Sequence, residues 1–484
     1  MTRKLESELT GEEPKERTKY PALIHVLLFA FLLLPSCNLA PKYFAPKPNL
    51  PTEFKTTGPW RTATPRDGAN RGDWWGSFGD AKLNALMKQA RAGSPTLELA
   101  MHRVTEAQAL ARADRAGLFP FVTLNGSANR GRGSGNLQFQ FAGGRTRSLM
   151  GATLDFDYEL DFWGRLRNQS RSGAARAEAE QADYQNALLG LQSELALNYF
   201  ALRTQDAQIA LLRRTVELRR KTVELARKRF NQGDIGQIDV AQAETDLAAT
   251  EAEAIGLEKR RAELEHAIAL LLGVTPSRLS LSAHEISGAP PSVPASVPSD
   301  LLERRPDIAG AERQMAALNA EVGVAKAALF PSLRIGLTGG TQTSYFWKIA
   351  DAPSRVWGLG PASVEWPLLR GGGVRANIDA AKARYDQAAA SYKQTVLAAM
   401  RDAEDALSGL SILKRQAEAQ AATVASARQA LDLSQKRYDS GLVAYFEVLD
   451  SQRTLLRAEQ EATRIQGERF LSAVLLIKAL GGGW

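Results

Sequence analysis

Apolar residues recur at every seventh position through a long stretch of the first half of the chain. The row contains Leu188, Leu195, Leu202, Ile209, Val216, Val223 and Phe230. A second set, two positions further on, contains Leu197, Leu211, Leu218 and Leu225. On an α-helix the second set lies about 200° around the axis from the first. The pattern predicts one helix over about residues 168–230, roughly 95 Å long, with an apolar seam on two nearly opposite faces. Such a helix needs a neighbour on each side, and a closed ring of helices satisfies every copy.

The same heptad row returns 208 residues later. It contains Val396, Ala403, Leu410, Ala417, Val424, Leu431 and Tyr438. The match continues beyond the row, because residues 228–233 align with residues 436–441. Further upstream, Leu118-Phe119-Pro120 aligns with Leu329-Phe330-Pro331 at an offset of 211. The chain is therefore an internal duplication, and a duplication decides the architecture before local detail does.

After each Phe-Pro pair the periodicity changes from helical to alternating. The clearest strand places Leu154, Phe156, Tyr158, Leu160 and Phe162 on one face, and Thr153, Asp155, Asp157, Glu159 and Asp161 on the other. The second repeat offers a similar strand from residue 332 and a less regular one near residues 356–367. Apolar residues toward lipid and polar residues toward a wet lumen are typical of a membrane β-barrel. Four strands per chain cannot close a barrel around a lumen, so an oligomer must supply the rest.

The N-terminus carries the features of a secretory signal that ends in a lipidation motif. Three basic residues precede an apolar run over residues 22–34, which then ends in Leu34-Pro35-Ser36-Cys37. Cys37 is the only cysteine in the chain, which excludes a disulfide framework. Acylation of Cys37 would anchor the mature chain in a membrane. The alternative is an uncleaved anchor with an incidental cysteine.

These patterns predict five segments. They are a signal peptide over 1–36, a lipid-anchored extended segment over 37–78, a first repeat over 79–278, a Pro/Ser-rich linker over 279–300 and a second repeat over 301–480. Within the repeats we expect β-hairpins over about 120–163 and 331–369, and long helix hairpins over about 164–272 and 372–480. Shorter helices are expected over about 81–93, capped by Asp80, and over about 95–117.

Composition offers little support for other classes of protein. The net charge of +8 comes from basic residues interleaved with acids, which disfavours a nucleic-acid interface. The four histidines are scattered over separate elements, so no metal-ligand cluster is visible and we expect neither a metal nor a cofactor. The glycines at 164 and 371–373 lack the Lys-Ser/Thr of a phosphate-binding loop. We therefore expect a protein that is not an enzyme.

The turns between the paired long helices, over residues 231–237 and 439–445, are the most informative candidate site. The strands are predicted at one end of the helices, so these turns are expected at the other end. Glu447 and Asp450 are three residues apart and share a helix face. In a trimer they would place six carboxylates around one axis, which favours cations. The simpler interpretation is that these acids only stabilise the start of a helix through its dipole.

Several motifs together resemble the outer membrane factor family of TolC-like exit ducts, in the lipoprotein branch of OprM and NodT type. They are Pro41-Lys42-Tyr43, Trp74-Trp75 with Phe78, both Leu-Phe-Pro sites, the segment 158–165, Arg305-Pro306-Asp307-Ile308 and the segment 448–453. The resemblance implies a mainly α-helical chain with a membrane β-barrel part. Three such chains would form a twelve-stranded barrel in the outer membrane, continued by a twelve-helix periplasmic tunnel.

The resemblance also implies partners and a gate. A homotrimer would dock to a periplasmic adaptor and an inner-membrane pump of the RND type, and pass drugs, metal ions or other small solutes outward. The residues that match the family's constriction are Asp239, Tyr438, Phe446, Glu447, Asp450 and Arg453. Val443 stands where a latch arginine occurs in TolC, so that link does not carry over. Two alternatives stay open, namely a type I protein-secretion duct and a lipid-anchored coiled-coil scaffold without a pore.

Overall fold

The computed structural model describes residues 38–44, 72–132, 146–291 and 304–482. The chain divides into two compact units, each assembled from separate stretches of sequence. The strand unit contains residues 122–165 and 326–368, and the helical unit contains residues 40–121, 166–325 and 369–484. Each repeat of the sequence therefore contributes to both units.

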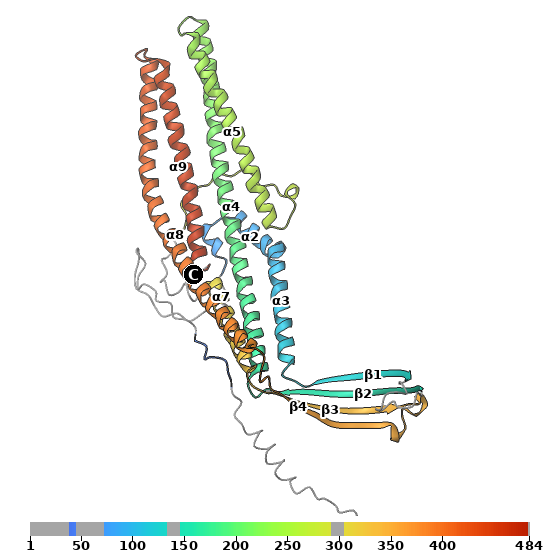
Figure 1. Cartoon of the computed structure of the whole chain (residues 1–484). Helices are drawn as coiled ribbons and strands as arrows, with labels where there is room; N and C mark the ends of the chain where they lie inside the picture. The colour runs from blue at the N-terminus through green and yellow to red at the C-terminus, as the bar shows by residue number, and fades with distance from the viewer. Residues whose placement is uncertain (1–37, 45–71, 133–145, 292–303, 483–484) are drawn as a thin grey trace, which may run out of the picture. The chain divides into compact units, whose positions relative to one another are not determined.

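The strand unit is one four-stranded antiparallel sheet in the order β1-β2-β3-β4 (Figure 1). Its strands are β1 (Phe121–Arg132), β2 (Thr146–Leu160), β3 (Ser332–Thr343) and β4 (Arg355–Glu365). The two hairpins of the duplicated sequence meet where β2 pairs with β3. The alternating pattern therefore correctly predicted a strand over residues 153–160, although β2 ends at Leu160 and Phe162 lies in the following turn.

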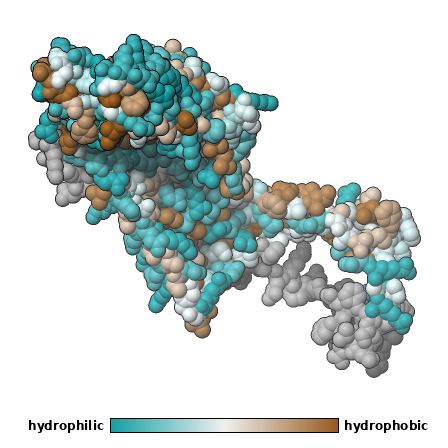
Figure 2. Space-filling model, turned by 90° about the horizontal axis from the view of Figure 1, so that it is seen from above, coloured by the Kyte–Doolittle hydropathy of each residue, from teal (hydrophilic) through white to brown (hydrophobic). Residues whose placement is uncertain are grey.

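One face of the sheet is apolar across three strands. Its rows are Leu154–Gly339–Trp357, Phe156–Leu337–Leu359, Tyr158–Ile335–Ala362 and Leu160–Leu333–Val364. The side chains of Trp357 and Leu359 are 83% and 79% exposed in the single chain, and Figure 2 shows apolar patches over the strands at the right of the view. An apolar sheet face with exposed side chains is what a lipid-facing sheet requires.

A register shift in β4 explains why its sequence pattern is irregular. Leu337 pairs with Leu359, but two residues earlier on β3, Ile335 pairs with Ala362. One additional residue in β4 lies between these pairs, at a point where Gly360 adopts a φ of +122°. Such a bulge changes which residues share a face, so the alternation breaks while the apolar rows continue.

The helical unit contains two long helix hairpins (Figure 1). The first is α4 (Arg165–Asn231) with α5 (Gln237–Leu271), and the second is α8 (Gly373–Asp439) with α9 (Tyr445–Ala479). The helices α4 and α8 both have 67 residues, and α5 and α9 both have 35. The duplication predicted from the heptad rows is thus matched helix by helix.

The heptad row of α4 forms the inner seam of the first hairpin. Leu195 and Leu202 are fully buried, and Ile209, Val216 and Val223 are between 4% and 8% exposed. Shorter elements pack beside the hairpins. They are η1 (Trp74–Phe78), α2 (Ala81–Gly93), α3 (Pro95–Ala116), η2 (Pro276–Arg278) and α7 (Pro306–Ala327).

The main hydrophobic core joins these short elements to the long helices. Phe200 of α4 lies between Phe78 of η1 and Phe470 of α9, with ring centroids 4.8 and 5.0 Å away. Asp80 caps α2 as predicted, because its Oδ1 accepts hydrogen bonds from the backbone N–H groups of Lys82 and Leu83. None of the helices in the described ranges is both long enough and apolar enough to cross a membrane.

Candidate functional site

The two hairpin turns have the same backbone structure. In the first, Gly233 has a φ of +78° and the N–H of Asp234 donates to the carbonyl of Arg229 at 3.0 Å. In the second, Gly441 has a φ of +73° and the N–H of Leu442 donates to the carbonyl of Arg437 at 2.9 Å. A left-handed glycine with this bond satisfies the last carbonyls of a helix and ends it. The repeats therefore present two turns of one shape at the same end of the helical unit (Figure 1).

Asp239 and Glu447 occupy equivalent positions after these turns but make different contacts. The Oδ2 of Asp239 accepts a hydrogen bond from the backbone N–H of Gly236 at 3.1 Å, which caps α5. Glu447 instead extends toward Arg437, with 3.8 Å between its Oε2 and the arginine Nη1. The helix-dipole interpretation therefore accounts for the geometry of Asp239 more fully than for that of Glu447.

Tyr438 takes part in a contact between the two hairpins. Its ring lies 5.3 Å from the ring of Tyr445, and the guanidinium of Arg229, on α4, lies 4.9 Å from its centroid. Tyr445 is 7% exposed and packs with Val223 of α4 in one apolar cluster. Burial raises the pKa of the Tyr445 hydroxyl to about 12. The two tyrosines belong to the second hairpin, and they attach it to the first through Arg229, which stacks on Tyr438, and Val223, which packs with Tyr445.

Arg453 forms a second link between the hairpins. Its Nη2 and Nε lie 2.7 and 3.2 Å from the Oδ1 of Asp246 on α5. Arg219 of α4 donates to the backbone carbonyl of Asp246 at 2.7 Å and also donates to the hydroxyl of Thr250. The hydrogen bond to Asp246 raises the pKa of Arg453, whereas burial lowers the pKa of Arg219. One buried carboxylate therefore lies near two guanidinium groups from two different helices.

The other predicted gate residues of the second turn face outward in this chain. Phe446 is 55% exposed, and Glu447 and Asp450 are also exposed. These three side chains lie in the first turns of α9, whereas Tyr438 and Arg453 face the first hairpin. The predicted set therefore divides into an exposed group, a group that links the hairpins, and Asp239 as a helix cap. Cys37, the predicted lipidation site, lies outside the described residues.

The sequence prediction omitted Asp246, Arg219, Arg229 and Tyr445, which complete the links. A signal for Asp246 was present in the pattern. It shares a stripe of α5 with the buried residues Ala243, Thr250 and Ala254. An acid within a stripe of small buried residues needs a charged or hydrogen-bonding partner. The partner itself is 207 residues away in sequence and has no local signature.

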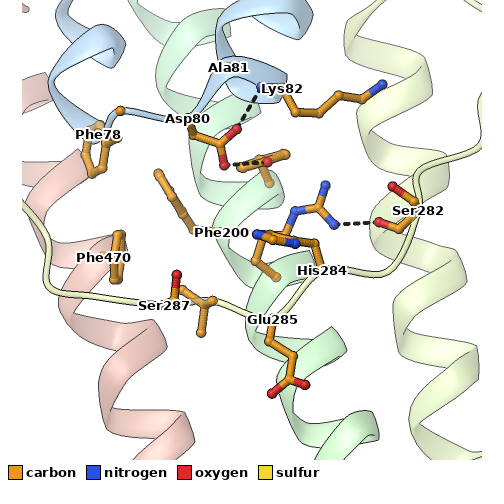
Figure 3. A pocket seen from close by; sticks show the side chains of 14 residues that line it. Phe78, Asp80, Ala81, Lys82, Phe200, Ser282, His284, Glu285, Ser287 and Phe470 are labelled. Atoms are coloured by element: carbon orange, nitrogen blue, oxygen red, sulfur yellow. Dashed lines mark hydrogen bonds between the residues drawn. The ribbon is translucent and has the colours of Figure 1, made fainter.

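A separate cavity of about 470 Å³ lies between η1, α2, α4 and the segment 282–287 (Figure 3). Asp80 lines it, and the hydroxyl of Tyr199 donates to Asp80 at 2.6 Å. Arg203 also lines it, and donates to Asp206 at 2.9 Å and to the carbonyl of Ser282 at 2.8 Å. These contacts hold the surrounding elements together. Within the described ranges no group of three acids, histidines or cysteines is arranged to hold a metal ion.

Comparison with known proteins identifies the chain's family. The sequence model described as "Outer membrane efflux protein" matches residues 86–274 and again residues 297–482, one match in each repeat. OpmQ of Pseudomonas putida, named a pyoverdine export outer membrane protein, is 33% identical over 416 residues, which are 85% of this chain and 88% of OpmQ. CusC of Escherichia coli, named a cation efflux system protein, is 30% identical over 94% of this chain and 97% of its own length.

Solved structures agree with this assignment. The outer-membrane channel OprN superimposes with a TM-score of 0.85 at 31% identity, covering 93% of this chain and all of OprN. A CusC structure gives a TM-score of 0.82 at 28% identity, covering 92% of this chain. The mainly helical fold with four antiparallel strands and a duplicated sequence is thereby confirmed. The chain belongs to the outer membrane efflux protein family, and it is a transport channel of the outer membrane and not an enzyme.

Proposed function

We propose that three copies of the chain form one exit duct, in which a twelve-stranded β-barrel continues into a tunnel of twelve helices. Support comes from apolar side chains on the long helices that the single chain leaves uncovered. Leu225 of α4 and Leu433 of α8, at equivalent positions of the two repeats, are 47% and 52% exposed. Leu218 and Ile412 are 51% and 52% exposed. Neighbouring copies would cover these residues in a closed ring.

The narrowest part of the duct is proposed at the second turn. Three copies would bring together the exposed side chains of Phe446, Glu447 and Asp450 around one axis. One observation supports this assignment. Arg453 and Tyr438 attach α8 and α9 to the first hairpin, whereas the side chains of Phe446, Glu447 and Asp450 stay exposed. Six carboxylates around a narrow opening would concentrate cations there.

The family and the named relatives support a proposal about the partners and the cargo. The duct would receive solutes from a periplasmic adaptor and an inner-membrane pump of the RND type. OpmQ is named for pyoverdine export and CusC for cation efflux, so small solutes such as drugs, siderophores or metal ions are the cargo class that we propose. Acylation of Cys37 would add a lipid anchor on the periplasmic side of the outer membrane.

Single-channel recording in planar bilayers tests the proposed constriction. The variant Glu447→Gln/Asp450→Asn removes two carboxylates per chain, and we expect the ratio of cation to anion permeability to fall severalfold. The matched control Asp379→Asn/Asp386→Asn removes two exposed acids of α8 that lie more than fifty residues before the turn, and should change the ratio much less. Equal selectivity in wild type and the Glu447/Asp450 variant would reject the acidic constriction. A protein that forms no pores would reject the duct itself.

A further inference from the structure

The apolar face of the sheet ends in an arginine on β4. We call the end of the sheet at which β1 and β3 finish and β2 and β4 begin the hairpin end. The apolar face of β4 runs from Leu359 through Trp357 to Arg355, which pairs with Thr341 at the hairpin end. Side chains on one face of a strand are two residues apart. A basic residue therefore directly follows an exposed tryptophan on this face.

The same change from apolar to basic occurs on β1. The side-chain amide of Asn125 donates to the Oδ2 of Asp155 at 2.6 Å, so the odd-numbered residues of β1 share the polar face with Asp155. Because successive side chains of a strand alternate, the even-numbered residues lie on the apolar face. Leu124 lies there and is 70% exposed. Arg130 and Arg132 are the last residues on this face of β1, and both are exposed.

No acid of the four described strands balances these arginines on the apolar face. The acids of β2 lie on the opposite face, as do Arg147 of β2 and Arg334 of β3. Arg130, Arg132 and Arg355 are thus the only charged residues that these strands contribute to the apolar face. All three lie toward the hairpin end, where this face carries only positive charge.

The arginines belong to the two edge strands, because β1 and β4 are the outer strands in the order β1-β2-β3-β4. In the proposed ring, β4 of one copy pairs with β1 of the next, since these are the strands that each sheet leaves without a neighbour. Each junction would then bring arginines of two copies to the same end of the lipid-facing surface. The site is incomplete in the single chain, and it rests on the proposed trimer.

Aromatic side chains lie at the hairpin end as well. In the segment between β3 and β4, the ring of Tyr345 lies 5.4 Å from that of Trp347, and the Nζ of Lys348 lies 5.6 Å from the Tyr345 centroid. The hydroxyl of Ser354 donates to the carbonyl of Lys348 at 2.6 Å, which holds this segment together. Tyr345 and Trp347 nevertheless remain exposed. Exposed aromatic and basic residues at the edge of an apolar surface are typical of the level where lipid tails meet headgroups.

We propose that each junction binds the phosphate groups of an anionic lipid in the outer leaflet of the outer membrane. The acyl chains would lie on the apolar face, and the phosphates would contact Arg130 and Arg132 of one copy and Arg355 of the neighbouring copy. A guanidinium group binds phosphate oxygens through two parallel hydrogen bonds, and basic clusters at a membrane surface attract anionic headgroups. The hairpin end faces the outer leaflet because the proposed duct extends its helices into the periplasm.

Native mass spectrometry of the full-length protein in detergent, with added lipid A as the phosphorylated lipid, tests the site. We expect the trimer to retain one lipid per junction. Arg130→Gln/Arg132→Gln should weaken this binding about tenfold, because two headgroup contacts are lost at each junction. Arg355→Gln, on the other side of the junction, should weaken it severalfold. Lipid A from which the phosphates have been removed should bind wild type about tenfold more weakly.

The matched control is Arg147→Gln/Arg334→Gln, which removes two arginines from the opposite face of the sheet. It should leave the binding of lipid A unchanged, and an equal loss in this control would overturn the site. Equal binding in wild type and both junction variants, or equal binding of the dephosphorylated lipid, would also overturn it while the trimer stands. A spectrum without any trimer would instead reject the proposed ring, and the junction site with it.

The variant Phe346→Cys tests which side of the membrane the hairpin end faces. Phe346 is 69% exposed, so a maleimide that cannot cross the outer membrane should label this variant in intact cells. Wild type, whose only cysteine is Cys37, gives the background. Labelling that requires a permeabilised outer membrane would place the hairpin end in the periplasm. That result would overturn the assignment to the outer leaflet.

Discussion

Arg453 of α9 contacts a single carboxylate oxygen of Asp246 of α5 with two nitrogens, at 2.7 and 3.2 Å. The Asp246 side chain is 9% exposed, and its backbone carbonyl accepts a further hydrogen bond from Arg219. This pair therefore couples two helices that belong to different repeats. Because its acid is buried, the pair is expected to matter more than an ion pair on the surface.

Replacing Asp246 by Asn should loosen the attachment of the second hairpin. The change leaves the Arg453 guanidinium without its carboxylate partner and removes a negative charge near Arg219. Because Arg453 is 38% exposed, the cost should be smaller than the roughly 3 kcal/mol of a fully buried pair. We expect a lower melting temperature and a larger single-channel conductance. Glu459→Gln is the control, because Glu459 pairs with Arg428 within the second hairpin only. If both variants behave alike, the Asp246 contact has no special role at the turn.

The first hairpin carries a ladder of exposed ion pairs at seven-residue intervals. Its rungs are Arg213–Glu258 at 2.8 Å, Arg220–Glu251 at 3.0 Å and Arg227–Glu244 at 2.6 Å. The second hairpin keeps one equivalent rung, Arg428–Glu459 at 2.6 Å. The other two equivalent positions hold Ala421 with Gln466 and Gln435 with Gln452.

The charge-reversed variant Arg220→Glu should open the first hairpin more often, because the introduced carboxylate would face Glu251 and like charges repel. Amide hydrogen exchange near residues 217–224 should then become about threefold faster. The double swap Arg220→Glu/Glu251→Arg should restore most of the wild-type protection, although not all of it, because Arg220 also pairs with Glu217 on its own helix at 2.6 Å. High salt should weaken the difference, since these pairs are exposed. An unrestored rate in the double variant would show that the ladder is not the cause.

Alkaline pH should loosen the contact between the hairpins. The pKa of Tyr445 is about 12 in the folded chain, and that of an exposed tyrosine is about 10. The folded state therefore retains a proton that the unfolded state loses. The contribution of Tyr445 to the free energy of unfolding is complete below pH 10 and declines as the pH rises toward 12. Tyr445→Phe removes that decline. The melting temperature of wild type minus that of the variant should decrease as the pH is raised from 8 to 11.5. A difference that stays constant would contradict the assignment.

Cys37→Ser should abolish acylation without removing any residue of the sheet or the hairpins. Labelled fatty acid should be incorporated into wild type and be absent from the variant. The variant should still form pores after it is reconstituted from detergent into planar bilayers. Label in the Cys37→Ser chain would exclude Cys37 as the modified residue. Conductance is the control that separates loss of the anchor from loss of the fold.

The regular parts of this fold could be predicted because they repeat. A heptad row imposes a long helix whatever its neighbours are, and Leu195 and Leu202 are fully buried as that row requires. The alternation around Phe156 likewise imposes a strand. The bulge at Gly360 could not be read from alternation, because one inserted residue exchanges the two faces of the strand.

The candidate site was predicted only in part for a different physical reason. Tyr438 and Arg453 were named, but their partners Arg229 and Asp246 lie more than two hundred residues away. No local pattern specifies a pairing over that distance. The contact of Tyr43 could not be predicted for the same reason, since its hydroxyl donates a hydrogen bond to Glu312, which is 269 residues away in the sequence.

The identical glycine turns at Gly233 and Gly441 have a consequence for recognition. In the proposed ring, six turns with the same backbone shape would lie around the end of the tunnel, and turns of the first repeat would alternate with turns of the second. Their side chains differ, however. The first turn has Asp234 and Ile238 where the second turn has Leu442 and Phe446. A partner that contacts all six turns must therefore fit a single backbone contour and two alternating sets of side chains, one with Asp234 where the other has Leu442.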